Sequence, residues 1–280
     1  MSGSIRHSLR CLAAEVLHGS GSLRLYGSVR RKLWPAEVCV LGLHRVLSAE
    51  EYGRVNSLEA ILMRESTFGE MLAYLKQRFQ VISLDTFLQP RKPTRQRTKP
   101  LCLITFDDGW RDNYTTALPL LRKFDLPAVV FLATATMGQP DGFWVEQFIA
   151  AWKDTPRRDR MQLHWQALQK DGNDPLVLET VIELLKHKSS AERDRMLAQL
   201  LPAKDKPEAS TQVDRMLSWQ EAMEMAESGV EIGSHTVNHP LLPYEDDSSL
   251  REELAQSKRI IEGRLGKSVS AFEWTLASGG

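Results

Sequence analysis

The chain has 280 residues, of which 42% are hydrophobic and 26% charged, a composition typical of an ordinary folded protein rather than a disordered or fibrous one. Lys plus Arg and Asp plus Glu both total 36, so no net charge would draw the protein to nucleic acid or to an acidic polymer. The length is sufficient for one large α/β domain, which we expect to span residues 37–280.

The first 36 residues form a basic segment in which six Lys and Arg side chains accompany a single acid, Glu15. Apolar residues at helical spacing between Leu9 and Leu17 predict a helix, which either packs on the domain or makes peripheral contact with a membrane surface. We find neither the apolar core of a secretory signal nor the ~20 apolar residues that a transmembrane span requires. These features favour a cytoplasmic protein, with attachment at the inner membrane as the alternative.

Apolar runs and helical spacing alternate from residue 37 onward. Residues 37–43 predict a buried strand, residues 66–79 a helix that begins with Ser66 as its cap, and residues 81–84 a further strand. Cys39 and Cys102 both lie in such apolar runs, so we expect buried, reduced thiols. A basic polar run at 91–99 is typical of a solvated loop.

Residues 101–106 form a continuous apolar strand that stops at Asp107-Asp108-Gly109. Asn113 is a candidate cap for the next helix, and residues 128–134 predict another strand. Alternation of this kind favours a parallel sheet, either open or closed into a barrel.

Residues 142–217 depart from this alternation and predict a helical insertion. The insertion either covers the site as a lid or wall, or has a packing role only. Its Trp144, Trp152 and Trp165 are suited to stacking on sugar rings, although tryptophan is more often a core residue.

After the insertion, residues 218–229 predict a helix with a Ser cap and a Gly stop, and residues 230–234 a strand. His235 and His239 follow this strand directly, and residues 252–266 predict the last helix. Because Pro240 disfavours helical geometry at His239, we expect a turn here rather than a helix.

Two adjacent carboxylates at a strand end can bend toward one site when a glycine follows, although Asp-Asp-Gly alone is also common in turns. Two imidazoles with one carboxylate can bind a divalent metal and leave positions open for water and substrate. The order of the two motifs is more informative than either alone.

The segment Thr105-Phe106-Asp107-Asp108-Gly109 resembles the first motif, and the segment from Ser234 to Pro240 the second motif, of the NodB-homology polysaccharide deacetylases. The resemblance extends from about Val38 to Lys267. It implies an irregular (β/α) barrel with the site at the C-terminal strand ends. It also implies a metal-dependent hydrolase that removes N-acetyl groups from a cell-envelope or exported glycan, in which Asp108, His235 and His239 hold a divalent metal such as zinc and Asp107 is the general base.

Many family members take the proton for the leaving amine from a late histidine, but no histidine follows His239 here. The poly-N-acetylglucosamine deacetylases resemble a circularly permuted arrangement with this histidine on the first strand. His44 is the matching residue, and either acts as the acid or shapes its loop.

The residues from Phe272 to Gly280 lack the aromatic-Pro-aromatic-Gly segment of this family, so we expect an incomplete C-terminus, an altered reading frame or a member of lowered activity. Two functions compete with glycan deacetylation. One is a catalytically impaired, metal-stabilised glycan-binding protein, and the other is an amidohydrolase that acts on a non-sugar amide.

Overall fold

This computed structural model describes residues 19–20, 22, 38–89, 99–140, 142–154, 177–200 and 212–273. The predicted N-terminal helix lies almost wholly outside these ranges, as do Trp165 and most of the 91–99 run. Within them, no helix combines the length and apolar character needed to cross a bilayer.

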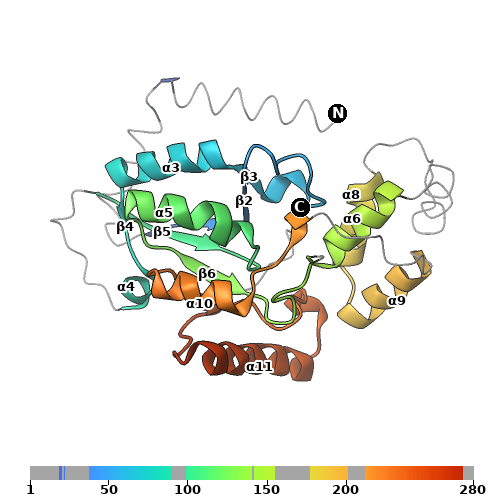
Figure 1. The fold of residues 1–280 in the computed structure, drawn as a ribbon. Coiled ribbons are helices and arrows are strands. Elements are labelled where there is room, and N and C mark those ends of the chain that lie inside the picture. The colour runs from blue at the N-terminus through green and yellow to red at the C-terminus, as the bar shows by residue number, and fades with distance from the viewer. Residues whose placement is uncertain are drawn as a thin grey trace.

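A parallel sheet lies at the centre of the fold (Figure 1). Its strands are β1 (Val38–Leu43), β4 (Gln80–Val81), β5 (Leu101–Phe106), β6 (Val129–Leu132) and β7 (Glu231–Ser234). The paired path runs β1-β5-β6-β7, while β4 pairs with the beginning of β5. A separate parallel pair joins β2 (Arg45–Leu47) to β3 (Leu62–Arg64). The α/β class is confirmed, and the pairing among the described strands is an open path.

Helices cover both faces of the sheet, and side chains alternate between these faces along each strand. The helices are α3 (Glu65–Arg78), α4 (Leu84–Leu88), α5 (Leu118–Phe124), α10 (Trp219–Glu227) and α11 (Asp247–Leu265). In β5, Ile104 and Phe106 point into the large core formed with α3, α5, α10 and α11, whereas Leu103 packs with Leu84 of α4 on the other face. This double cover explains why β5 is buried along its whole length.

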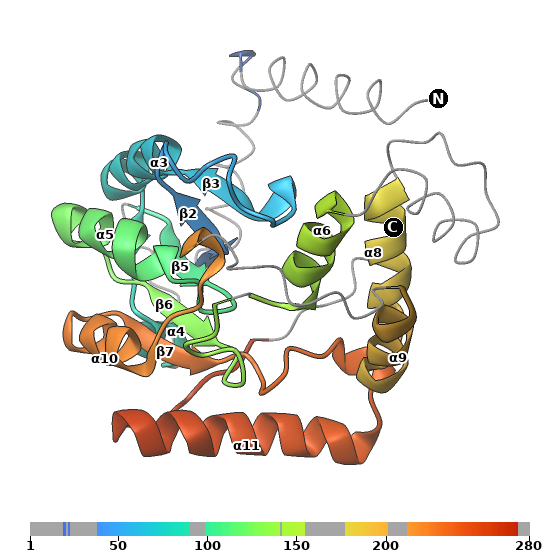
Figure 2. The ribbon, with the colours of Figure 1, turned by 45° about the vertical axis from the view of Figure 1, so that its right-hand side comes forward.

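The helical insertion contains α6 (Trp144–Asp154), α8 (Val177–Lys186) and α9 (Ser190–Leu200). These helices group beyond the arrowhead of β6 (Figures 1 and 2). They share a small core of their own, in which Phe148, Ile182 and Leu185 are almost fully buried. Trp152 is also buried in this core, so packing rather than sugar stacking accounts for it.

Several local predictions are wrong. Helix α3 begins at Glu65, without a side-chain cap from Ser66, because the chain leaves β3 directly into the helix. The predicted strand at 81–84 ends at Val81, since Ser83 caps α4. Cys39 is exposed because β1 lies at the end of the paired path.

Asn113 is also not a cap. It begins a π-helical turn, η2 (Asn113–Ala117), and its Nδ2 donates to the His44 carbonyl at 2.7 Å. By contrast, the predicted cap of α10 is confirmed, because Ser218 and Glu221 form a reciprocal capping box. Two short 3-10 turns, η3 (Gln212–Asp214) and η4 (Leu242–Tyr244), flank the last third of the fold, and η1 (Glu59–Ile61) precedes β3.

Candidate metal centre and active site

Two carboxylates stand at the C-terminal end of β5, where the chain leaves the sheet. The Asp107 N–H still donates to the Leu43 carbonyl of β1, at 2.9 Å. Asp108 and Gly109 then adopt positive φ angles of 77° and 85°, in a region that glycine enters more easily than aspartate. A Cβ on Gly109 would lie 2.9 Å from Leu132 Cδ2. The turn therefore requires the glycine that the motif supplies.

Two histidines occupy the loop after β7. His235 begins the loop, and Thr236 and His239 have positive φ angles of 69° and 54°, so the loop is a turn, as Pro240 predicted. The Glu253 carboxylate of α11 accepts two backbone N–H groups of this loop, at 2.7 and 2.9 Å. Glu253 therefore holds the loop that carries both imidazoles.

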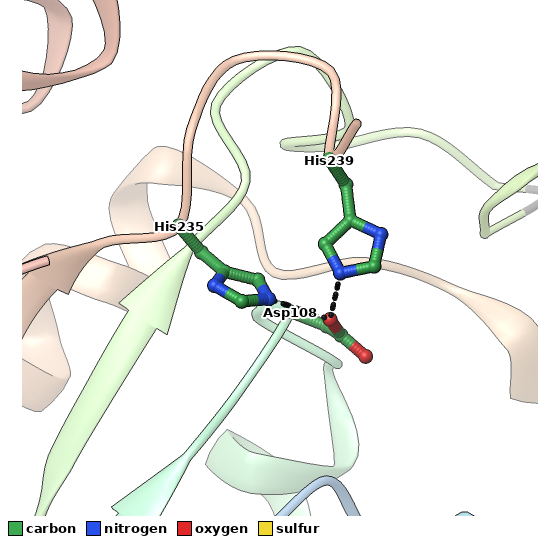
Figure 3. Close-up of side chains that lie close together, drawn as sticks. All are labelled: Asp108, His235 and His239. Carbon is green, nitrogen blue, oxygen red and sulfur yellow. Dashed lines mark ion pairs between the residues drawn. The ribbon is translucent and has the colours of Figure 1, made fainter. Parts of the chain in front are cut away.

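The carboxylate of Asp108 meets both imidazoles (Figure 3). Its Oδ1 lies 3.4 Å from His235 Nε2 and 3.4 Å from His239 Nε2, and one ligand atom of each residue lies within 4.8 Å of the others. Asp108 and His235 are buried, and the His239 side chain is 22% exposed. One side of the cluster therefore remains open to solvent.

The donor set fits a divalent metal ion. Ligand atoms at ~2.0–2.2 Å from a tetrahedral zinc lie roughly 3.4 Å from one another, which matches both oxygen–nitrogen separations here. Asp108 Oδ1 is buried and has no hydrogen-bond partner among the described residues. The Nδ1 atom of His235 lies 2.9 Å from the Glu273 carbonyl, which would fix the tautomer that leaves Nε2 as a ligand.

The charges of the cluster determine the pH at which its three ligands lose their protons and can bind a metal ion. Burial alone would raise the pKa of Asp108, but its contact with His235 and its electrostatic interaction with His239 lower that pKa well below its usual range. Burial lowers the pKa of His239 to about 4, so this imidazole is neutral. Burial also acts to lower the pKa of His235, but Asp108 outweighs it and the pKa is raised. Of the three ligands, His235 holds its proton most tightly.

Trp110 supports Asp108 from behind. Its indole N–H donates to Asp108 Oδ2 at 2.9 Å. This hydrogen bond leaves the other carboxylate oxygen, Oδ1, facing the two histidines. Trp110 is fully buried, and the Arg45 guanidinium lies 4.1 Å from its ring centroid. Arg45 is in turn fixed by Asp112 and Asp214, at 3.0 and 2.8 Å. This buried network joins β2, the turn after β5 and η3 behind the metal centre.

Asp107 lies beside the cluster and not within it. Its Oδ2 is 3.9 Å from His44 Nε2, and the His44 side chain is 35% exposed. Burial raises the pKa of Asp107, and the neighbouring Glu273 and Asp108 carboxyls raise it further. The Asp107 Oδ1 is buried without a hydrogen-bond partner in the described part of the chain. The five predicted site residues therefore meet at one end of the sheet.

The insertion reaches the same place through the start of α6. The Phe143 ring lies 4.8 Å from the His239 ring, between centroids. Glu146 accepts the Phe143 N–H at 3.2 Å, and burial raises the pKa of Glu146 to about 7. The insertion is thus a wall of the site as well as a packing unit.

Sequence reasoning missed four supporting residues, which are Arg45, Trp110, Glu253 and Glu273. Trp110 directly follows the Asp-Asp-Gly motif and Arg45 directly follows His44, so proximity to a motif was a usable signal for both. Glu253 lies on a mixed-charge helix whose sequence gives no hint of its role.

Comparison with known proteins identifies the family. The family model described as polysaccharide deacetylase matches residues 94–278, which is more than half of the chain. The Bacillus subtilis (strain 168) protein YxkH, named provisionally as a polysaccharide deacetylase, is 37% identical over 59 residues, or 21% of this chain and 20% of that protein. The chain thus aligns with only a fifth of this relative's length.

Two solved structures are similar in part. The Streptococcus pyogenes deacetylase PplD in complex with acetate is 17% identical with a TM-score of 0.46, over 84% of this chain and 71% of PplD. A de-N-acetylase from Aggregatibacter actinomycetemcomitans is 15% identical with a TM-score of 0.48, over 86% of this chain and 82% of that one. On the extent of the family match, this chain belongs to the polysaccharide deacetylase family.

Proposed function

We propose that this protein is a metal-dependent hydrolase that removes N-acetyl groups from a glycan of the cell envelope or of an exported polymer. The observation that carries the proposal is the convergence of Asp108, His235 and His239 beside the separate carboxylate of Asp107. Family membership supports the glycan as substrate class.

Asp108, His235 and His239 would hold the cation, and zinc is the first candidate because the ligands are two imidazoles and one carboxylate. When bound there, a divalent cation supplies a Lewis acid for the amide carbonyl and lowers the pKa of water toward about 7. The three ligands leave coordination positions for water and substrate.

Asp107 would accept the proton of the attacking water. Because burial and two carboxyl neighbours raise its pKa, Asp107 would hold its own proton at neutral pH in the absence of a cation. With a divalent cation held beside Asp108, Asp107 would lose this proton more readily and would act as a base.

His44 would donate a proton to the leaving amine. Its Nε2 lies 3.9 Å from Asp107 Oδ2, and its exposed fraction lets a sugar amine approach it from solvent. The water oxygen would first bond to the acetyl carbon while Asp107 takes its proton, and the carbon–nitrogen bond would then break as His44 protonates the nitrogen, giving acetate and a free amine.

Substitution Asp107→Asn tests the mechanism. We expect acetate release from N-acetylated chito-oligosaccharides and poly-N-acetylglucosamine to fall by about 100-fold or more, because general base catalysis contributes roughly that factor. Zinc binding should persist, since Asp107 is not a ligand. Asp85→Asn, an exposed change of the same type, is the matched control. Equal turnover in Asp107→Asn and wild type would remove Asp107 from the mechanism.

A glycan-binding protein without turnover is the second candidate, and Glu273 favours it. The Glu273 carboxyl raises the pKa of Asp107, which opposes the ionised form that a base requires. If the zinc-loaded wild-type protein binds these glycans but releases no acetate, the binding function replaces the enzymatic one.

A further inference from the structure

Helix α9 of the insertion carries a buried arginine, Arg193, that the proposed mechanism does not use. Arg193 is 5% exposed, and its guanidinium lies 5.0 Å from the ring centroid of Trp144 in α6. Burial lowers the pKa of this guanidinium from its usual value, but arginine keeps its charge at neutral pH.

The charge of Arg193 is poorly compensated. Its ion pair within the described residues is with Asp194, at 3.8 Å, and the Asp194 side chain is 72% exposed, so water weakens the attraction. The Nε atom of Arg193 is buried and has no hydrogen-bond partner in the described ranges. Because a buried cation without good partners costs several kcal/mol, this arrangement is typical of a site that receives an anion.

The contacts of α9 connect it to segments on either side of the metal centre. The N–H and hydroxyl groups of Ser190 donate to Glu245, at 2.9 and 2.6 Å, in the segment that follows the His239 loop. Trp144, under the guanidinium, follows Phe143, whose ring packs on His239. Figures 1 and 2 show α9 alongside α8, in the same group of helices as α6.

We propose that Arg193 binds an anionic substituent of the glycan, a carboxylate or a phosphate ester, on the sugar at or beside the N-acetyl group that is hydrolysed. The planar guanidinium has a fork of N–H donors that suits both groups, and no hydrogen bond to another described residue occupies those donors. The Glu245 carboxylate interacts with Arg193 only through longer-range electrostatic attraction, and it already accepts two hydrogen bonds from Ser190. The position of the anion beside a hydrolysed N-acetyl group rests on the proposed function, whereas the binding of an anion by Arg193 does not.

A test compares neutral and anionic N-acetylated oligosaccharides of equal length on the full zinc-loaded chain. One anionic ligand carries a uronic acid carboxylate and the other a phosphate ester, so the two sources of the anion are separated. Calorimetry measures binding, and acetate release measures turnover. We expect the wild-type protein to bind at least one anionic ligand about 10-fold or more tightly than the neutral one, as a charge-assisted bidentate contact would give.

Arg193→Gln should abolish this preference and leave the affinity for the neutral ligand unchanged. Arg193→Lys should keep part of it, because the charge remains without the fork. Arg195→Gln is the matched control, since Arg195 lies on the same helix, is exposed and donates from Nε to the Ala191 carbonyl. Its preference should equal that of the wild type.

Absence of a preference in the wild-type protein would overturn the inference, even if Arg193→Gln failed to fold. Equal loss of affinity for neutral and anionic ligands in Arg193→Gln would also overturn it, because that pattern is expected of a structural arginine. If no ligand released acetate while calorimetry showed an Arg193-dependent preference, the enzymatic proposal would fail and the anion-binding role of Arg193 would stand. Turnover without a preference would support the enzymatic proposal and overturn the anion-binding role.

Discussion

The hydrogen bond from Trp110 to Asp108 gives a measurable link between the buried network and metal affinity. In Trp110→Phe the aromatic ring remains beside Arg45 and Phe143, but the donor to Asp108 Oδ2 at 2.9 Å is lost. A hydrogen bond to a charged acceptor contributes about 1.5–3 kcal/mol. At ~1.4 kcal/mol per factor of ten, loss of this bond weakens zinc binding by up to roughly 100-fold. In other proteins, mutation of a residue that hydrogen-bonds to a metal ligand lowers metal affinity by about 10- to 100-fold, which agrees with this value.

Competition with a chelator of known zinc affinity measures this effect, and chemical unfolding of the metal-free protein shows whether the variant is folded. Trp219→Phe is the control, because Trp219 starts α10, away from the metal ligands. A folded Trp110→Phe protein with wild-type zinc affinity would refute the claim that the indole orients Asp108.

Further predictions concern stability and pH. Arg45→Met removes the buried guanidinium that forms ion pairs with the buried Asp112 and Asp214 carboxylates, and should cost about 3–5 kcal/mol in urea unfolding; a loss below about 1 kcal/mol would contradict this. Gly233→Ala should lower stability by about 1–3 kcal/mol in thermal unfolding, because its Cβ would clash with the Phe131 ring, whereas Gly69→Ala in α3, with open space around it, should not. Zinc affinity should fall as pH falls through the raised pKa of His235, beginning above the ordinary value of about 6.5, because the proton occupies the ligand nitrogen. Constant affinity from about pH 8 to 5.5 would contradict the last prediction.

The strands that carry the site could be predicted from the sequence because each is an apolar run that stops at polar ligands. The runs at 101–106 and 230–234 match β5 and β7 within a residue. Both strands pair in parallel with β6, which brings their C-terminal ends to the same edge of the sheet. Because the alternation of strand and helix predicts a parallel sheet, it also predicts that Asp108 and His235 lie close together.

The errors fall where short-range signals compete. The apolar run at 81–84 predicted a strand, but the Ser83 hydroxyl accepts the Thr86 N–H and turns the chain into α4. Asn113 has the chemistry of a cap, yet its amide donates to the His44 carbonyl across the fold. In both cases the local structure depends on which of several possible partners the polar side chain hydrogen-bonds to. The sequence pattern alone does not show which partner is favoured.

The support of the site was hidden for a related reason. Arg45 binds Asp112 and Asp214, which lie 67 and 169 residues away in the chain. Glu253 reaches the histidine loop from α11 across 15 or 16 residues. Such pairs form only when distant segments pack together in the tertiary structure, and a single sequence does not show directly which segments do so.

The backbone of the metal centre has a further consequence. Asp108, Thr236 and His239 all occupy left-handed torsions that disfavour residues with a Cβ, at about 1 kcal/mol or more each. Ligand bonds would compensate these torsions in the loaded protein, whereas among the described residues Asp108 Oδ1 has ion pairs with the two histidines but no hydrogen bond. In the metal-free protein, amide hydrogens of the two ligand loops should then exchange with solvent faster than those of β5 and β7. Loss of the cation would thus loosen the loops while the strands of the sheet stay protected from exchange.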